Sequence, residues 1–419
     1  MEQERQKALL IGANVDFEKD FNEKMDELEK LANACEIDVV SREIQNLFEI
    51  NRALYIGKGK AEEISKIADT LSVDLVIFNN ELSPTQLRNL QDIINCSVID
   101  KTALILEIFS KRARTKEAKL QVEVARLEYM LPRLVGMRTN LGRQGGGAGL
   151  SNKGSGEKKL ELDRRRIESK LTELKKELEE LSVDREIQRK RREESDIPLV
   201  SLVGYTNAGK SSLMNYMIDR FVKDEEKKVV EKDMLFATLE TSVRKIELED
   251  NRKFLLSDTV GFISDLPHDL IKAFRSTLEE IKNADLLLEV IDYSDPNFYD
   301  HIQVTKDTLE KLGVDDIPII YVYNKSELML DKLPLIDEDE IYLSIKEKRG
   351  LNELIDMIID RLFKDYKRCK MLIPFSEGSI LSYLIDNANV LDTEYTENGT
   401  LINIECTDAQ YNKYKEYIV

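Results

Sequence analysis

The chain has few of the residues that build metal centres, and it lacks long apolar runs. It has four cysteines and only two histidines among 419 residues. The cysteines lie far apart and match no zinc-ligand spacing, so we expect buried or free thiols in a reducing compartment. No run approaches the roughly 18 apolar residues of a membrane-spanning helix, and the amino-terminal residues have no apolar core of signal-peptide length. These absences predict a cytoplasmic protein without a membrane span.

The chain has fewer basic than acidic residues. The 62 lysines and arginines are outnumbered by 80 acidic residues, which gives a net charge of −18. Because phosphate contacts need lysine and arginine, this balance excludes nonspecific nucleic-acid binding over the whole surface, and any such contact is expected to be local. Charged residues make up 34% of the chain, above the usual quarter or so, which indicates long exposed helices. The length exceeds that of a single hydrophobic core and predicts about three domains.

Residues 8–110 alternate short apolar runs with helix-like periods, which predicts a parallel sheet with crossover helices. The apolar runs are 8–11, 37–44, 53–56, 75–78 and 98–99. One helix start is well marked, with Ser83 as N-cap, Pro84 at the first helical position and Gln86 completing a capping box. The glycines of IGKGK at 56–60 lack the spacing of a phosphate loop, so this segment is interpreted as a basic turn before a helix.

Two helices with matching apolar stripes follow, and they predict an antiparallel helical hairpin. The stripes are Leu120, Val124, Leu127 and Leu131, then Leu160, Ile167, Leu171, Leu174, Leu178 and Leu181. The joining segment, 131–156, contains no acid and includes the glycine-rich run QGGGAG at 144–149. Its basic residues are Arg133, Arg138, Arg143 and Lys153. Because glycine is costly to order unaided, we expect this segment to order on RNA phosphate, the alternative being a solvated linker.

The most specific motif is G-x-x-x-x-G-K-[ST] at 204–211, placed between an apolar strand-like run and a helix start. Gly204 and Gly209 let backbone N–H groups face phosphate oxygens, Lys210 adds a cation for the β and γ phosphates, and Ser211 offers a hydroxyl to Mg²⁺. The predicted phosphate-binding residues are Gly204, Tyr205, Thr206, Asn207, Ala208, Gly209, Lys210, Ser211 and Ser212. Asn207 is also a candidate for holding a monovalent cation such as K⁺ beside the phosphates.

The motif belongs to a second alternating region, with strands expected at 197–203, 254–256, 286–291, 317–323 and 341–343. Asp258 and Gly261 follow the second of these strands, where P-loop enzymes keep a carboxylate for the Mg²⁺ shell and a glycine N–H for the γ-phosphate. Thr238 lies in the preceding charged, poorly periodic segment and is the expected γ-phosphate sensor. The predicted metal-binding residues are therefore Ser211, Thr238 and Asp258, and the catalytic ones Lys210, Thr238 and Gly261.

The base site is expected at Asn324, Lys325 and Glu327, after the strand at 317–323. An asparagine amide can pair with O6 and N7 of guanine, and a carboxylate three residues on can accept from N1–H and the 2-amino group, whereas adenine offers neither donor. GTPases normally have aspartate where this chain has Glu327. Residues expected to close the base pocket are Ser344, Ile345 and Lys346.

The last part of the chain predicts a compact α+β domain. A strand is expected at 371–373 and a helix at 378–387, followed by two strands joined through Asn398-Gly399, a strong hairpin signal. Thr407 and Gln410 are expected to cap a final helix.

Four segments resemble the HflX family of ribosome-associated GTPases. They are DTVGFISDLPHDLIKAFRSTLEEIKNADLLLEVID at 258–292, IGKGKAEEI at 56–64, LGRQGGGAG at 141–149 and GSGEKKLELDRRRI at 154–167. The resemblance implies that the amino-terminal domain and the glycine-rich loop face the 50S subunit, with the loop near the peptidyl-transferase region. It also implies switching on Thr238 and Gly261, and a role in splitting or rescuing stalled 70S ribosomes under stress. Glu327 and Leu239-Glu240-Thr241, where relatives more often have Asp-Pro after the leucine, depart from the family pattern.

Ras-like GTPases place a glutamine after the Asp-x-x-Gly motif to orient water, but this chain has Phe262, which cannot hydrogen-bond water. We therefore expect slow hydrolysis without the ribosome. Two alternatives stay open here: an ATP-using P-loop kinase or ATPase, and an RNA-binding module with a mainly structural GTPase domain. Guanine-reading residues count against the first, and the intact phosphate-site residues count against the second.

Together these observations predict an α/β protein in which a P-loop GTPase domain is joined to an amino-terminal α/β domain with a helical hairpin and to a small carboxy-terminal α+β domain. The expected boundaries are 1–112, 113–195, 196–366 and 367–419. The expected ligands and partners are GTP or GDP, Mg²⁺, the 50S subunit, the 70S ribosome and ribosomal RNA, with the protein itself a monomer.

Overall fold

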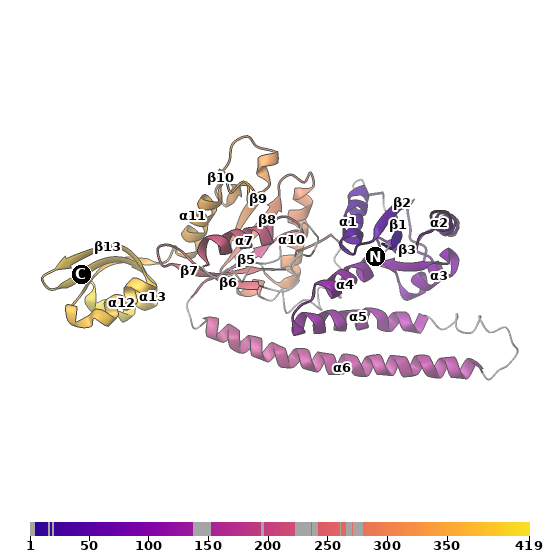
Figure 1. Cartoon of the computed structure of the whole chain (residues 1–419), viewed down its shortest axis with the longest axis horizontal. Coiled ribbons are helices and arrows are strands. Elements are labelled where there is room, and N and C mark those ends of the chain that lie inside the picture. The colour runs from indigo at the N-terminus through magenta and orange to yellow at the C-terminus, as the bar shows by residue number, and fades with distance from the viewer. Residues whose placement is uncertain are drawn as a thin grey trace. The chain divides into compact units, whose positions relative to one another are not determined.

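The computed structural model (Figure 1) describes residues 5–15, 17–18, 21–136, 152–193, 197–222, 236, 242–259, 261–264, 270, 280–314 and 316–419. Side chains are described in these ranges except at 135–136, 152–160 and 182–193. By its contacts the chain forms two compact units. The first unit comprises Met1–Arg189, Lys232–Glu240 and Ile263–Ser276, and the second comprises Lys190–Glu231, Thr241–Phe262 and Thr277–Val419. The four-domain division expected from the sequence stays a prediction.

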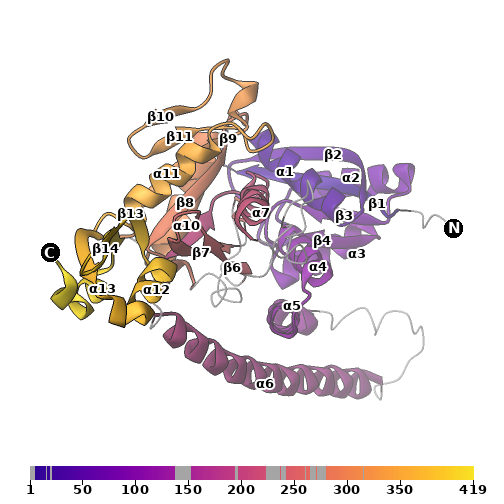
Figure 2. The ribbon, with the colours of Figure 1, turned by 60° about the vertical axis from the view of Figure 1, so that its left-hand side comes forward.

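The first unit is built on a four-stranded parallel sheet in the order β2-β1-β3-β4 (Figures 1 and 2). Its strands are β1 (Lys7–Val15), β2 (Asp38–Leu47), β3 (Leu75–Phe78) and β4 (Ser97–Asp100), and its helices are α1 (Phe21–Ala34), α2 (Lys58–Leu71), α3 (Pro84–Ile94) and α4 (Lys101–Arg112). Helix α1 contacts α4, and α2 contacts α3. The predicted parallel sheet with crossover helices is confirmed, as is the capping box of Ser83 and Gln86.

One apolar run does not form the expected strand. Residues 53–56 lie in a turn closed by an isolated bridge between Asn51 and Tyr55. The Oδ1 atom of Asn51 accepts hydrogen bonds from the backbone N–H groups of Ala53 and Leu54 at 2.8 and 3.0 Å. The Asn51 side chain therefore binds backbone N–H groups that would otherwise donate to a neighbouring strand. The chain forms a turn instead of a strand.

The helical hairpin consists of α5 (Lys116–Gly136) and α6 (Asn152–Glu193). The predicted stripes meet in one apolar cluster, whose buried members are Val124, Leu127, Leu171 and Leu174. Exposed ion pairs join the same two helices, Glu123 to Lys170 and Glu128 to Lys175, each at 2.6 Å. Both helices extend further than expected, so that 131–136 and 152–156 of the predicted joining segment are helical. The glycine-rich run lies outside the described residues.

The second unit contains a seven-stranded sheet in the order β10-β11-β9-β8-β5-β7-β6. Its strands are β5 (Leu199–Val203), β6 (Ser242–Glu247), β7 (Lys253–Asp258), β8 (Leu286–Asp292), β9 (Ile319–Asn324), β10 (Leu335–Asp337) and β11 (Glu340–Tyr342). The helices are α7 (Lys210–Phe221), α10 (Phe298–Leu312) and α11 (Leu351–Leu362). The five central strands are parallel and correspond to those predicted. The edge strands β6 and β10 are antiparallel and lie outside the predicted set, since neither has a continuous apolar run.

A smaller sheet, β12-β14-β13, ends the second unit. Its elements are β12 (Lys367–Ile373), α12 (Gly378–Asn387), β13 (Asn389–Thr396), β14 (Gly399–Cys406) and α13 (Asp408–Lys413). Short 3₁₀ helices lie at Ile281–Asn283 (η3), Ser326–Leu328 (η4), Phe375–Glu377 (η5) and Lys415–Tyr417 (η6). The predicted hairpin and the capping box of Thr407 and Gln410 are both present. Among the described residues, no helix is both long and apolar enough to span a bilayer.

Candidate nucleotide-binding site

The loop at 204–209 joins β5 to α7, and two of its glycines are required by close backbone approach. Gly204 has φ +128°, and a Cβ there would lie 2.4 Å from the carbonyl oxygen of Val290. Gly209 has φ +111°, and its Cβ would lie 2.3 Å from Nδ2 of Asn324. Only glycine tolerates both the positive φ and the missing space. The loop therefore stays thin enough for backbone N–H groups to approach phosphate oxygens.

Lys210 begins α7 and is buried, with 6% of its surface exposed. Its Nζ donates to the carbonyl oxygens of Gly204 at 2.9 Å and Tyr205 at 2.6 Å, so the ammonium group lies beneath the loop. Burial lowers the pKa of Lys210 to about 8, opposed by the nearby charge of Asp258. A bound polyphosphate would stabilise the charged lysine, because it would replace the lost hydration with a negative partner.

Ser211 and Asp258 come together as the sequence predicts. The hydroxyl of Ser211 donates to Oδ2 of Asp258 at 2.9 Å. Asp258 is fully buried at the end of β7, where it pairs in register with Leu202 of β5. A hydroxyl and a carboxylate are oxygen ligands of the kind that Mg²⁺ prefers, so this pair fits a magnesium shell. Thr238, the third predicted metal-binding residue, lies outside the described residues.

Gly261 and Phe262 are held against the phosphate loop. A Cβ at Gly261 would lie 2.9 Å from Cα of Thr206 and 3.0 Å from Nζ of Lys210. The N–H of Phe262 donates to Gly204 O at 3.2 Å, and the N–H of Thr206 donates to Phe262 O at 2.8 Å. The side chain of Phe262 is 2% exposed. The chain after Asp258 is thus joined to the loop by backbone hydrogen bonds, and Gly261 is close enough to sense what the loop binds.

The remaining loop residues have distinct environments. Tyr205 is buried, and its ring stacks on that of His301 from α10 with centroids 3.8 Å apart. Asn207 is exposed and has φ +63°. Ala208 is buried, whereas Ser212 lies in the first turn of α7 and is partly exposed.

Asn324, at the end of β9, connects the phosphate loop to the second predicted base-binding segment. Its Nδ2 donates to Ala208 O at 2.9 Å, and its Oδ1 accepts from the N–H of Ile345 at 3.1 Å. This geometry differs from the expected pairing of the amide with both O6 and N7 of guanine. Because Nδ2 carries two hydrogens, one donor remains for a base, and it suits N7.

The other predicted base-site residues differ in their burial and partners. Lys325 Nζ donates to Oδ2 of Asp292 at 2.6 Å, and Asp292, the last residue of β8, was not among the predicted site residues. Its signal was a polar residue at the carboxyl end of a parallel strand, the edge where open α/β sheets bind ligands. Glu327 carries a buried Oε2 atom without a hydrogen-bond partner among the described residues. Ser344 is buried and Lys346 exposed.

Comparison with known proteins identifies the family. Residues 22–110 match the family model "GTP-binding GTPase N-terminal", 112–192 match "GTP-binding GTPase Middle Region", and 199–325 match "50S ribosome-binding GTPase". The GTPase HflX of Caldanaerobacter subterraneus subsp. tengcongensis is 42% identical over 418 residues, covering 99% of this chain and 94% of the relative. The chain belongs to the HflX GTPase family.

A second curated relative agrees with this assignment. The GTPase HflX of Escherichia coli K12 is 36% identical over 96% of this chain and 93% of the relative. Among solved structures, a GTP-binding protein from Sulfolobus solfataricus in complex with GDP has 25% identity, covers 86% of this chain and 99% of that chain, and gives a TM-score of 0.44. The predicted family, fold class and GTP-hydrolysing activity are confirmed, which decides against the ATP-using alternative and against an RNA-binding module with a mainly structural GTPase domain.

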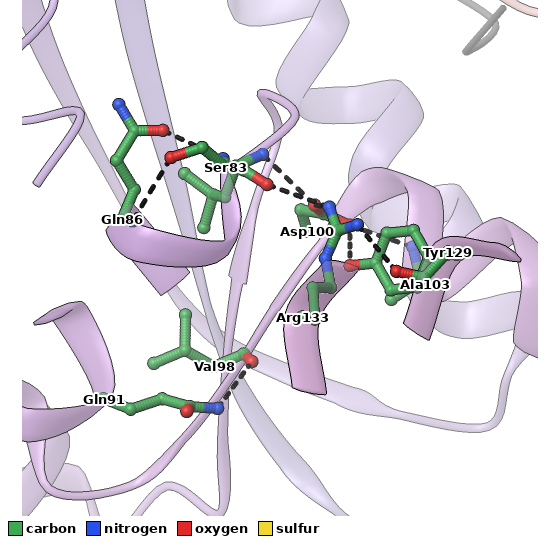
Figure 3. Close-up of polar contacts among 9 residues, drawn as sticks. Ser83, Gln86, Gln91, Val98, Asp100, Ala103, Tyr129 and Arg133 are labelled. Atoms are coloured by element: carbon green, nitrogen blue, oxygen red, sulfur yellow. Dashed lines mark hydrogen bonds and ion pairs between the residues drawn. The ribbon is translucent and has the colours of Figure 1, made fainter. Parts of the chain in front are cut away.

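The basic residues expected to contact RNA in this HflX GTPase are only partly described. Arg138 and Arg143 lie outside the described residues, and Lys153 lies in α6 with its side chain not described. Arg133 requires a correction, because its guanidinium pairs with Asp100 (Figure 3), at 3.2 Å, and its side chain is only 10% exposed. A guanidinium committed to a buried carboxylate does not offer its charge to RNA phosphate, so we do not retain Arg133 as an RNA contact.

Proposed function

We propose that this GTPase binds GTP with Mg²⁺ in the cytoplasm, associates as a monomer with the 50S subunit, and splits or rescues stalled 70S ribosomes under stress. The observation that carries the proposal is the match of 199–325 to a family described as 50S ribosome-binding GTPase, within a chain related to HflX GTPases over nearly its whole length. The acid-free sequence between α5 and α6 would supply local positive charge on a chain of net charge −18.

The phosphate end of the site accounts for binding and for charge stabilisation. Lys210 places a cation beneath the loop, where it would meet the β and γ phosphates. Ser211 and Asp258 would hold Mg²⁺, which supplies charge neutralisation at the phosphates when it is bound. Thr238 and Gly261 would sense the γ-phosphate, and Asn207 is positioned on the loop surface as the candidate for a monovalent cation.

The base end accounts for the choice of guanine. Oε2 of Glu327 is a buried acceptor that lacks a hydrogen-bond partner among the described residues. A ligand with N–H donors would supply that partner. Guanine has such donors at N1 and at the 2-amino group, whereas adenine has no N1–H. An unpaired buried carboxylate is costly, so a base that leaves it unpaired is disfavoured. Asn324 then contributes its remaining N–H to N7.

Hydrolysis is expected to depend on the ribosome. Phe262 is buried and has no group that can orient water, so the residue that follows Gly261 does not activate the nucleophile. A group supplied by the ribosome would complete the site. Ribosomal RNA is the expected partner of the glycine-rich segment, through Arg138, Arg143 and Lys153.

Sedimentation with purified 30S, 50S and 70S particles tests the proposal. We expect binding to 50S and 70S that is stronger with a non-hydrolysable GTP analogue than with GDP, weakens with salt, and decreases when 144–149 is deleted or when Arg138 and Arg143 become glutamine. Lys413→Gln with Lys415→Gln is the matched control, since it removes the same charge from exposed positions near the carboxyl terminus. Absence of co-sedimentation in the triphosphate state would contradict the ribosomal partner.

A further inference from the structure

Helix α4 is contacted by both segments of the chain that are expected to sense the γ-phosphate. Ser264 lies three residues after Gly261, and its carbonyl oxygen accepts from Nζ of Lys101, the first residue of α4, at 2.9 Å. Phe236 lies two residues before Thr238, and its ring packs edge-on against that of Phe109 in α4, with centroids 4.8 Å apart. By their contacts, 232–240 and 263–276 belong to the first unit together with α4.

The contact at Lys101 is buried and specific. The side chain of Lys101 is 4% exposed and that of Glu27, from α1, is 11% exposed, and their ion pair measures 2.5 Å. Oε2 of Glu27 also accepts from the N–H of Ser264 at 3.4 Å. A buried ammonium group cannot leave its partners without a large desolvation cost. Movement of Ser264 must therefore shift Lys101 and Glu27 with it or break this arrangement.

The residue before Lys101 holds the end of α5. Asp100 is fully buried and is the N-cap of α4, accepting from the N–H of Ala103 at 3.0 Å. Its carboxylate also accepts from the hydroxyl of Tyr129 at 2.7 Å and from Nη2 of Arg133 at 3.2 Å (Figure 3). Arg133 in turn donates to the carbonyl oxygens of Tyr129 and Leu82, each at 2.9 Å. These bonds fix the last turns of α5, which ends at Gly136, within the segment 131–156 that the sequence predicts to bind RNA.

We propose that Asp100 and Lys101 are positioning residues through which α4 couples the nucleotide state to the position of the carboxyl-terminal turns of α5. A packed helix responds to a pull at one end by a small rigid shift rather than by local bending. A shift of α4 driven at Lys101 and Phe109 moves the adjacent Asp100, and Asp100 carries Tyr129 and Arg133 with it. This inference rests on the proposed function in one respect only. The movement of α5 would serve to present the segment that follows it to ribosomal RNA.

A probe on α5 measures the coupling without any ribosome. The chain contains no tryptophan, so Met130→Trp provides a single fluorescent reporter. Met130 is the residue after Tyr129 in α5 and is 37% exposed. We expect its fluorescence to differ between the GDP state and the state with a non-hydrolysable GTP analogue. In the same background, Glu27→Gln with Lys101→Met, and separately Asp100→Asn with Arg133→Gln, should remove most of that difference. Each pair of substitutions removes both charges, so that no buried charge is left alone.

Glu123→Gln with Lys170→Met is the matched control, because it removes an exposed ion pair between α5 and α6 and should leave the signal unchanged. Thermal melting of each variant identifies any that fail to fold, and nucleotide affinities should stay within about twofold of the parent. An unchanged signal in both folded test variants, or no nucleotide-dependent signal in the parent, overturns the proposal.

Ribosome sedimentation separates this inference from the proposed function. For each protein we compare its affinity for 50S with the triphosphate analogue bound and with GDP bound. We expect the ratio of these two affinities to fall at least about fivefold in the two test variants, because coupling between two sites typically begins at about that size. A chain that binds no ribosomal particle but keeps the fluorescence response contradicts the ribosomal partner and leaves the coupling standing. Nucleotide-dependent ribosome binding that both test variants retain in full overturns the coupling and leaves the partner standing.

Discussion

The side-chain amide of Asn324 donates to the carbonyl oxygen of Ala208 at 2.9 Å, so the segment predicted to read the base and the phosphate loop are joined by one side chain. The same amide accepts from the N–H of Ile345. We therefore expect nucleotide binding at either end of the site to depend on the order of the other end. An asparagine at this position has a structural role in addition to any contact with the base.

Asn324→Ala should weaken the binding of both GDP and GTP. The substitution removes the remaining N–H for the base, worth about 1 kcal/mol, so we expect a loss of at least about fivefold. Loss of the two protein hydrogen bonds should add to it by loosening the loop. Titration calorimetry with both nucleotides measures it. Asn251→Ala, which removes a bond to Ile385 O at an exposed site, is the control and should leave affinity unchanged. An Asn324→Ala variant of parental affinity would show that the connection is dispensable.

Glu327 should decide between guanine and adenine. Glu327→Gln replaces an acceptor-only group by one that also donates, so we expect the preference for GTP over ATP to fall by at least tenfold, about 1.4 kcal/mol. Glu327→Asp should keep or tighten guanine binding, since it restores the residue that GTPases normally use. Titration with GTP, GDP, ATP and ADP tests both variants. Equal binding of all four nucleotides by the unmodified protein would remove the guanine-site assignment.

The fold and the phosphate site were largely accessible from the sequence because their signals are local. Gly204, Gly209 and Lys210 define their loop within a few residues, and the leucine stripes of the hairpin reflect helical periodicity. Asn51 illustrates a local signal that was overlooked, since a side chain that binds backbone N–H groups two and three residues ahead makes a turn from an apolar run. The edge strands β6 and β10 have apolar runs too short to predict a strand.

Arg133 shows why part of the site could not be predicted. Composition places it among acid-free, basic residues, yet its partner Asp100 lies 33 residues earlier in the sequence. Only the packing of α5 against α4 brings the two together, and no spacing rule encodes that distance. The same holds for Lys101 and Ser264, which are separated by 163 residues. Charge counts identify a basic segment but do not distinguish an exposed guanidinium from a buried one.

Lys210 should make nucleotide binding dependent on pH above neutrality. Burial lowers its pKa to about 8 in the free protein, and a bound polyphosphate should raise it again, so binding takes up a proton once the pH exceeds about 8. Affinity for GDP should then fall by up to about tenfold per pH unit between pH 8 and pH 10. Calorimetry in buffers of different ionisation enthalpy detects the proton uptake. Lys210→Met should bind weakly at every pH and show no such uptake; if it did show it, another group would be responsible.

Glu289 should make stability depend on pH through a different mechanism. It lies in the middle of β8, is 2% exposed, and its Oε1 has no hydrogen-bond partner among the described residues. Burial raises its pKa to about 8, opposed by a hydrogen bond to Thr305. A carboxyl with a raised folded-state pKa stabilises the folded state most at a pH below its pKa in the unfolded chain, about 4.5. This contribution is lost as the pH rises through about 8, because ionisation then occurs in both states.

Glu289→Gln should therefore leave stability little changed at pH 5.5 and increase it at pH 9 relative to the parent. The expected gain at pH 9 is roughly 1–3 kcal/mol, since an amide can stay buried without a charge. Denaturant unfolding of the two proteins at pH 5.5, 7 and 9 measures the difference. Glu310→Gln, at an exposed position on α10, is the matched control and should show no pH-dependent difference. An equal effect of Glu289→Gln at all three pH values would mean that the carboxyl does not change its ionisation in the folded state over this range.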